Sequence, residues 1–148
     1  MVDEPLSHEG FDGDKLLIRI NVTIAADEKA ISPVVDGVMA MARQMKCAEG
    51  KEFEIEMAMR EALANAVKHG CNGDSSKQIQ CCIACNDNKG ILIIVRDPGK
   101  GFDADHLPNC TDGENLYSNH GRGIYLINQL MDEVKFARNG SEIHMKKL

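Results

Sequence analysis

The side chains best suited to chemistry in this sequence lie in a charged stretch, Arg60–His69. Glu61, Asn65 and Lys68 are four and three residues apart, a spacing that places them along one stripe of a helix. A glutamate can accept a proton from an attacking hydroxyl, an amide oxygen can ligate Mg²⁺, and a lysine ammonium can neutralise phosphate. The stripe therefore indicates a face that meets a charged ligand, and a solvated helix surface is the competing explanation.

A second candidate segment, Asp97–Asp103, follows directly after an apolar run. Gly99 and Gly101, with Phe102 after them, allow a tight turn and a close approach of the backbone to a flat ligand. Asp97 accepts hydrogen bonds and donates none, which suits the exocyclic amino group of adenine. Ordinary turns after strands have a similar composition, so this segment is weak evidence when taken alone.

A third segment, His120–Ile127, begins with glycines and becomes apolar, as at the start of a helix. Backbone N–H groups at a helix N-terminus can hold phosphate groups, which makes Gly121, Gly123 and Ile124 candidate binding residues. Arg122 adds a fork of donors, although its side chain can equally lie in solvent. The sequence contains no GxxxxGK[ST] pattern, which excludes a Walker-type ATPase.

The elements that position these segments are predicted from hydrophobic periodicity and turn residues. Strand patterns occur at 15–24, 77–86, 90–96, 133–138 and 142–147, the last two joined by an Asn-Gly turn. Helical spacing of apolar residues occurs at 28–46, 52–69 and 121–131. Strands joined by hairpins, with helices on one face, predict a two-layer α/β (α+β) sandwich with a mixed, mostly antiparallel sheet.

Length and composition are those of one globular domain. The chain has 148 residues, of which 43% are hydrophobic, enough for one core. We expect a flexible tail at 1–14 and a single domain at 15–148. The net charge of −6 argues against direct binding to nucleic acid. With no membrane-spanning apolar run and an acidic start unlike a signal peptide, we expect a cytoplasmic protein without membrane contact.

Three of the six cysteines, Cys81, Cys82 and Cys85, cluster in one predicted strand. Successive side chains of a strand point to opposite faces, so Cys82 points away from the other two. The three thiols therefore do not converge on a metal ion, and a tetrahedral site needs a fourth ligand. We expect buried free thiols that pack as small hydrophobic side chains, and no disulfide framework.

The order and spacing of the three segments resemble the N, G1 and G2 boxes of the GHKL superfamily, which includes gyrase-type ATPases and histidine kinases. Within it the chain is most similar to the anti-sigma-factor serine/threonine kinases of the RsbW and SpoIIAB type. Glu61–Gly70 matches their N box, and Gly121–Val134 matches their G2 box and the residues that follow it. The resemblance extends over residues 23–147, nearly the whole chain.

This resemblance implies the Bergerat ATP-binding fold, Mg-ATP as the nucleotide, a short lid between Phe102 and His120, and a homodimer. Family members hold a sigma factor inactive and phosphorylate a STAS-domain anti-anti-sigma antagonist. By the same resemblance Glu61 would be the catalytic base, Asn65 the Mg²⁺ ligand and Asp97 the reader of adenine. The glycines of the second and third segments would shape the pocket.

Two alternatives stay open. Lys68 departs from the anti-sigma pattern and is more typical of histidine kinases, which favours a histidine-kinase-like ATP-binding domain. Such a domain needs a phosphoacceptor on a long helix, and His8 lacks the amphipathic surroundings for one. The other alternative is a non-catalytic switch, in which nucleotide orders the lid and the chain grips a partner. Glu61 argues against this switch, because pseudoenzymes often lose that group.

Overall fold

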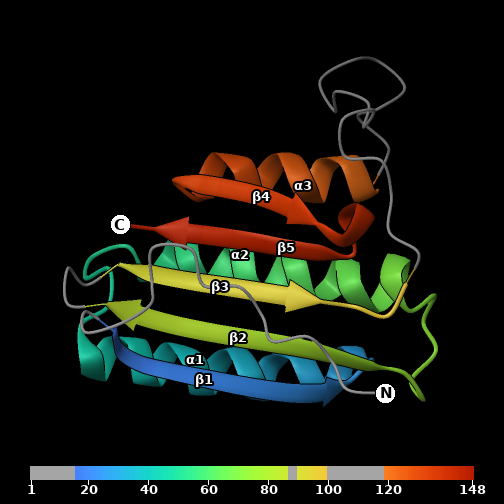
Figure 1. Ribbon diagram of the computed structural model, residues 1–148, viewed down its shortest axis with the longest axis horizontal. Helices are drawn as coiled ribbons and strands as arrows, with labels where there is room; N and C mark the ends of the chain where they lie inside the picture. Colours follow the sequence, from blue (N-terminus) through green and yellow to red (C-terminus); the bar gives the residue numbers. More distant parts are fainter. Residues whose placement is uncertain (1–15, 87–89, 100–118) are drawn as a thin grey trace.

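The computed structural model describes residues 16–86, 90–99 and 119–148 (Figure 1). In chain order the elements are β1 (Leu16–Ala25), the 3-10 turn η2 (Glu28–Ala30), α1 (Ile31–Met45), α2 (Glu52–Asn65), the π-helical turn η3 (Ala66–Gly70), β2 (Gln78–Asn86), β3 (Ile91–Arg96), α3 (Asn119–Leu130), β4 (Glu133–Ala137), the 3-10 turn η6 (Arg138–Gly140) and β5 (Glu142–Lys147). The strands and helices expected from the sequence are therefore present. None of the described helices is long and apolar enough to cross a membrane.

The five strands form one sheet in the order β1-β2-β3-β5-β4. All four neighbouring pairs are antiparallel, so the described sheet is antiparallel throughout rather than mixed. The reason is topological: β3 and β4 run in the same direction, but β5 inserts between them and pairs antiparallel with both. The prediction of a two-layer α+β sandwich is confirmed.

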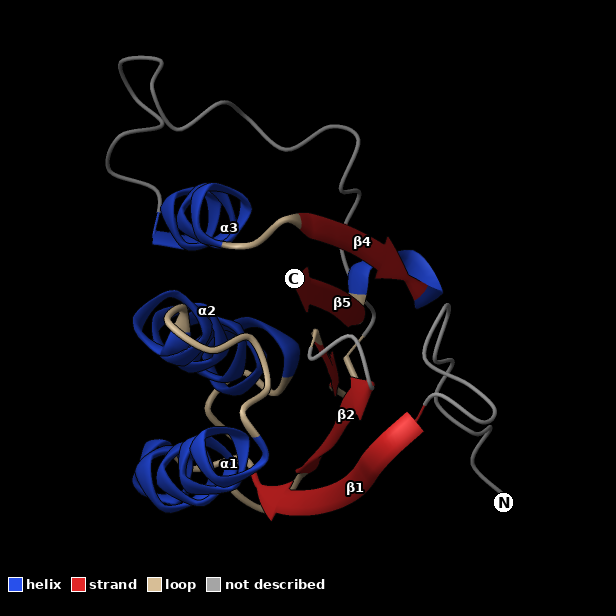
Figure 2. Cartoon of the chain, turned by 90° about the vertical axis from the view of Figure 1, so that its left-hand side faces the viewer, coloured by secondary structure: helices blue, strands red, loops and turns tan. Residues whose placement is uncertain are grey.

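The helices α1, α2 and α3 lie on one face of the sheet (Figure 2). Alternate residues of the central strands, Ile83 and Ile93 among them, are fully buried in the core on this helix side. The intervening residues form a second buried cluster on the other face: Cys82, Ala84, Leu92 and Ile94. The alternation confirms that Cys82 points away from Cys81 and Cys85.

Helix α1 meets the core through a stripe of buried residues at helical spacing, including Val35, Val38 and Met39. Helix α2 does the same with Ile55, Met59 and Leu63, among others. Truncating such a fully buried side chain to alanine typically costs about 2–5 kcal/mol of stability. The packing of α2 between α1 and α3 fixes the helix that carries Glu61 and Asn65.

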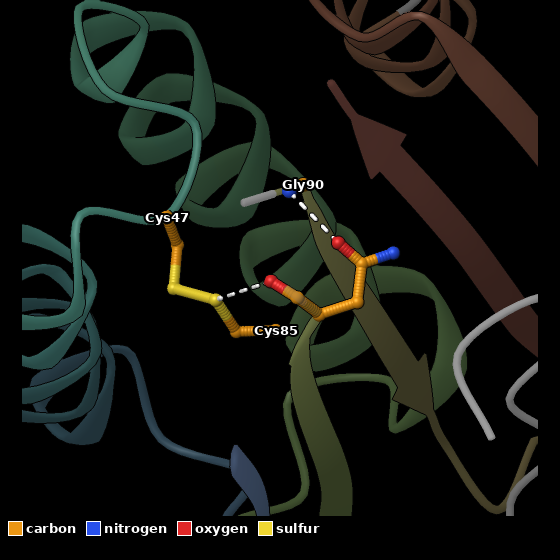
Figure 3. The surroundings of a disulfide bond; sticks show 4 residues. Cys47, Cys85 and Gly90 are labelled. Carbon is orange, nitrogen blue, oxygen red and sulfur yellow. Dashed lines mark hydrogen bonds between the residues drawn. A yellow bond between two sulfur atoms is a disulfide. The ribbon is translucent and has the colours of Figure 1, made fainter. Parts of the chain in front are cut away.

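The expectation of free thiols is wrong for Cys85, which forms a disulfide with Cys47 (Figure 3). At the end of α1, Lys46 and Ala48 adopt left-handed backbone angles (φ 58° and 50°). These angles turn the chain so that Cys47 faces the end of β2, a contact that strand periodicity does not reveal. Cys81 and Cys82 are buried and form no disulfide, as expected, and the same is true of Cys71.

Candidate functional site

A cavity of about 590 Å³ opens between the C-terminal end of α2 and the ends of the central strands. Its volume lies within the usual range for a small-molecule site. The described residues that line it come from α2, η3, α3 and the strand ends: Ala62, Asn65, Ala66, His69, Gly70, Asn72, Lys77, Val95, Asp97, Pro98, Gly99, Ile124, Ile127, Phe136, Gly140, Ser141 and Ile143. The structure thus brings Asn65, Asp97, Gly99 and Ile124 of the predicted set together.

Asp97 is the acidic residue that lines the cavity in the described part of the chain, and its position is fixed from two sides. Its backbone N–H donates to the Ser141 carbonyl oxygen at 2.9 Å, and its Oδ1 accepts from the Gly99 N–H at 2.8 Å. Within the described residues, Oδ2 has no hydrogen-bond partner. Burial raises the pKa of Asp97, and the hydrogen bond from Gly99 partly opposes this rise. The carboxylate therefore offers an acceptor to a ligand with an N–H or O–H group.

Gly70 explains how the carboxylate of Asp97 fits against the end of η3. A Cβ placed on Gly70 would lie 2.1 Å from Asp97 Cγ, a distance that no real side chain could keep. A residue with a side chain at position 70 would therefore displace Asp97 from the cavity wall. The His69–Gly70 end of the first segment is in this way a structural part of the site.

Glu61 and Asn65 lie one helical turn apart on α2 and both face the first turns of α3. A Cβ placed on Gly123 would lie 2.9 Å from Asn65 Nδ2 and 3.0 Å from Glu61 Oε2. Gly123 is buried, so its lack of a side chain lets the two polar groups approach α3 closely. A carboxylate and an amide thus meet beside the second turn of α3; Asn65 lines the cavity, whereas Glu61 lies next to it and is not a lining residue.

Lys68 does not join this group. Its Nζ lies 4.0 Å from Glu28 Oε1 of η2, and its side chain is 54% exposed. The reason is the π-helical winding of Ala66–Gly70, where the Cys71 N–H bonds to the Ala66 carbonyl oxygen five residues earlier. The stripe expected for Glu61, Asn65 and Lys68 therefore ends at Asn65, because the α-helical spacing does not continue to position 68.

Several residues of the cavity wall were not singled out from the sequence. His69 has a signal in the sequence only as part of the first segment, and Asn72 and Lys77 lie in a polar turn without a distinctive pattern. Ser141 follows the Asn-Gly turn, and its Oγ donates to the Arg138 carbonyl oxygen at 2.8 Å. Burial, reinforced by the nearby Lys68 charge, lowers the pKa of His69 and so favours the neutral imidazole.

The remaining predicted site residues are described in part or not at all. Gly121 and Arg122 belong to the first turn of α3, but their side-chain environment lies outside the described residues. Gly101, Phe102 and the predicted lid are also outside them. The described part of the chain holds no group of three or more His, Cys, Asp or Glu side chains able to bind a metal ion. Among the described lining residues, the amide oxygen of Asn65 is a donor of the type that Mg²⁺ prefers.

Comparison with known proteins supplies independent findings. Residues 24–147 match the family model of the histidine kinase-like ATPase domain. The serine-protein kinase RsbW of Staphylococcus epidermidis is 36% identical over 100 residues, which cover 62% of this chain and 62% of that protein. This chain therefore spans less than two thirds of the length of that relative.

Two further relatives are matched over more of their length. The serine-protein kinase RsbW of Bacillus velezensis is 28% identical over 137 residues, or 86% of this chain and 84% of that protein. The anti-sigma F factor of Geobacillus thermodenitrificans is 28% identical over 133 residues, or 85% of this chain and 80% of that protein. The sequence similarity thus extends over both the α2 segment and the α3 segment.

Proposed function

The chain belongs to the histidine kinase-like ATPase domain family, and we propose that it is an ATP-dependent protein serine/threonine kinase acting as an anti-sigma factor. In this proposal it binds Mg-ATP in the cavity, holds a sigma factor and phosphorylates a STAS-domain antagonist. Similarity to relatives named serine-protein kinase and anti-sigma F factor supports it.

The chemistry of the cavity supports adenine as the base. Val95, Ile127 and Ile143 supply apolar walls for a flat ring, and Asp97 supplies an acceptor beside them. The adenine amino group would donate to this carboxylate, whereas guanine presents a carbonyl oxygen at the same place. A site with a buried acceptor discriminates strongly against a ligand that leaves it unpaired.

The observation that carries the kinase proposal is the convergence of Glu61 and Asn65 on Gly123. Asn65 would hold Mg²⁺ through its amide oxygen, and the ion would neutralise charge on the phosphates it shares. Backbone N–H groups at the start of α3 would hold phosphate oxygens. Glu61 would accept the proton of a serine or threonine hydroxyl. The hydroxyl oxygen would bond to the γ-phosphorus as the bond between that phosphorus and ADP breaks.

The partners belong to the same proposal. We expect a cytoplasmic homodimer whose other partners are the sigma factor and the antagonist. The net charge of −6 disfavours direct contact with nucleic acid, and no membrane partner is proposed.

Glu61→Gln tests the kinase proposal with labelled ATP and a STAS-domain antagonist. The change keeps the size of the side chain and removes the proton acceptor, so transfer should fall roughly 10²–10⁴-fold while ATP affinity stays near wild type. Glu54→Gln, seven residues earlier on the same helix, is the matched control and should transfer normally. Undiminished transfer by Glu61→Gln would remove Glu61 from the mechanism. If the wild-type protein binds a partner in the presence of ATP without phosphorylating it, the result would favour the non-catalytic switch.

A further inference from the structure

A buried charged network lies directly behind Asp97. Arg96 of β3 and Glu142 of β5 are opposite each other in the sheet, and Arg96 Nε lies 2.7 Å from Glu142 Oε2. Their side chains are only 9% and 4% exposed. The other carboxylate oxygen of Glu142 lies 2.6 Å from His144 Nε2, and Arg96 Nη1 lies 3.5 Å from Gln80 Oε1. Polar contacts on three strands thus meet at one end of the sheet.

The network is adjacent to the cavity through the backbone. Asp97 follows Arg96, Ser141 precedes Glu142, and the Asp97 N–H donates to the Ser141 carbonyl oxygen at 2.9 Å. Arg96 and Glu142 form the terminal pair of β3 and β5, next to Asp97 and Ser141 of the cavity wall. Hydrogen bonds at the ends of strands are among the first to open. The placement of Asp97 therefore depends on how firmly this last pair is held.

Stability alone is a weak reason for two charges at this position. Replacing a buried ion pair with well-packed apolar side chains is often neutral or even stabilising. A buried ion pair and an apolar pair differ in geometry. A charge-assisted hydrogen bond fixes a distance and an angle, whereas apolar contact is non-directional. An ion pair here gives the strand ends a fixed relative position that an apolar pair would not.

We propose that the Arg96–Glu142 ion pair is a positioning element of the nucleotide site. It locks the last pair of residues between β3 and β5 and so holds the Asp97 carboxylate toward the base. The inference rests on the proposed nucleotide-binding function and extends it to the residues that set base selectivity. Arg96 and Glu142 act through Asp97 and are not themselves lining residues of the cavity.

The test compares ATP and GTP dissociation constants by calorimetry in wild type, Arg96→Met and the double variant Arg96→Met/Glu142→Leu. The double variant contains neither charge of the pair, so it should fold even if the single variant does not. Ile83→Ala is the control, because it empties a fully buried core position away from the cavity wall. Both Arg96 variants should lose roughly ten- to a hundredfold of the preference for ATP, as expected when a hydrogen bond to a charged group is weakened. The Ile83→Ala control should keep the wild-type preference for ATP over GTP.

Hydrogen exchange at the Asp97 amide is the second readout. In the Arg96 variants, the protection of the Asp97 amide should fall relative to that of the Ile93 amide at the centre of β3. In the Ile83→Ala control, the protection of both amides should match the wild type. A double variant with wild-type preference for ATP and wild-type protection at Asp97 would overturn the positioning role. A wild type that binds neither nucleotide would overturn the proposed function instead, and exchange at Asp97 would then still decide whether the pair holds the strand ends.

Discussion

Reduction of the Cys47–Cys85 disulfide should destabilise the fold strongly. The bond joins residues 38 positions apart in the sequence, so the closed loop contains the whole of α2 and η3. Cross-linking a loop of this length restricts the unfolded chain and stabilises the native state by about 4 kcal/mol at 25 °C. Both cysteines are buried, and the reduced thiols would pack as small hydrophobic side chains. Most of the loop-closure contribution should therefore appear as lost stability.

Urea unfolding followed by circular dichroism, with and without a reductant, measures this loss. With a slope of about 2 kcal/mol/M, the midpoint should fall by about 2 M. The melting temperature should fall by about 8–16 °C, from about 2–4 °C per kcal/mol for a chain of this size. A Cys47→Ala/Cys85→Ala variant is the control: reductant should leave its midpoint unchanged, because the other cysteines in the described part of the chain, Cys71, Cys81 and Cys82, form no disulfide.

The disulfide should have little effect on the cavity. Lys77, which lines the cavity, precedes β2, and Cys85 lies near the other end of that strand, roughly 25 Å away at the rise of an extended chain. Nucleotide affinity of the folded, reduced protein should therefore match that of the oxidised protein. Equal urea midpoints, in protein whose thiol count shows that the bond had formed, would refute the loop-entropy argument. A parallel loss of affinity would refute the separation of disulfide and cavity.

Three further predictions concern the cavity itself. Asn65→Ala should abolish the Mg²⁺-dependent part of ATP affinity in calorimetry, with little change in the melting temperature of the empty protein. A variant whose ATP affinity still rises with Mg²⁺ as in wild type would contradict the role of Asn65 as Mg²⁺ ligand. Burial raises the pKa of Asp97 above its ordinary value of 3.8, so ionisation of this one carboxyl should subtract from the stability of the empty protein as pH rises from about 4 through the raised pKa. Asp97→Asn should remove this loss, so that its stability advantage in urea titrations grows with pH, and a pH-independent difference would count against the raised pKa. Gly123→Ala should lower the stability of the fold by the roughly 1–3 kcal/mol that overpacking costs. It should also weaken Mg-ATP binding in calorimetry, since the added methyl displaces Asn65 and Glu61. The control Gly37→Ala, with open space around its Cβ on α1, should bind normally and be more stable by about 0.5–1 kcal/mol.

The secondary structure and the layering of this protein are largely determined by local sequence patterns. The apolar runs of β2 and β3, which are buried on both faces, and the helical spacing in α1 and α2 depend on residues close in the chain. The same local logic identified Asp97 and Gly99 after a strand and Asn65 on a helix, and all three line the cavity. These positions are predictable because a strand end or a helix turn fixes its own geometry.

Only the tertiary structure decided how these pieces meet. The π turn directs Lys68 to Glu28, and the end of α1 brings Cys47 to Cys85 across 38 residues. The pairing of β3 with β5 places Arg96 against Glu142. Each of these contacts joins segments far apart in the sequence, or depends on a break in regular geometry. Periodicity reports which face a side chain occupies, whereas packing and strand register determine which distant residue it contacts.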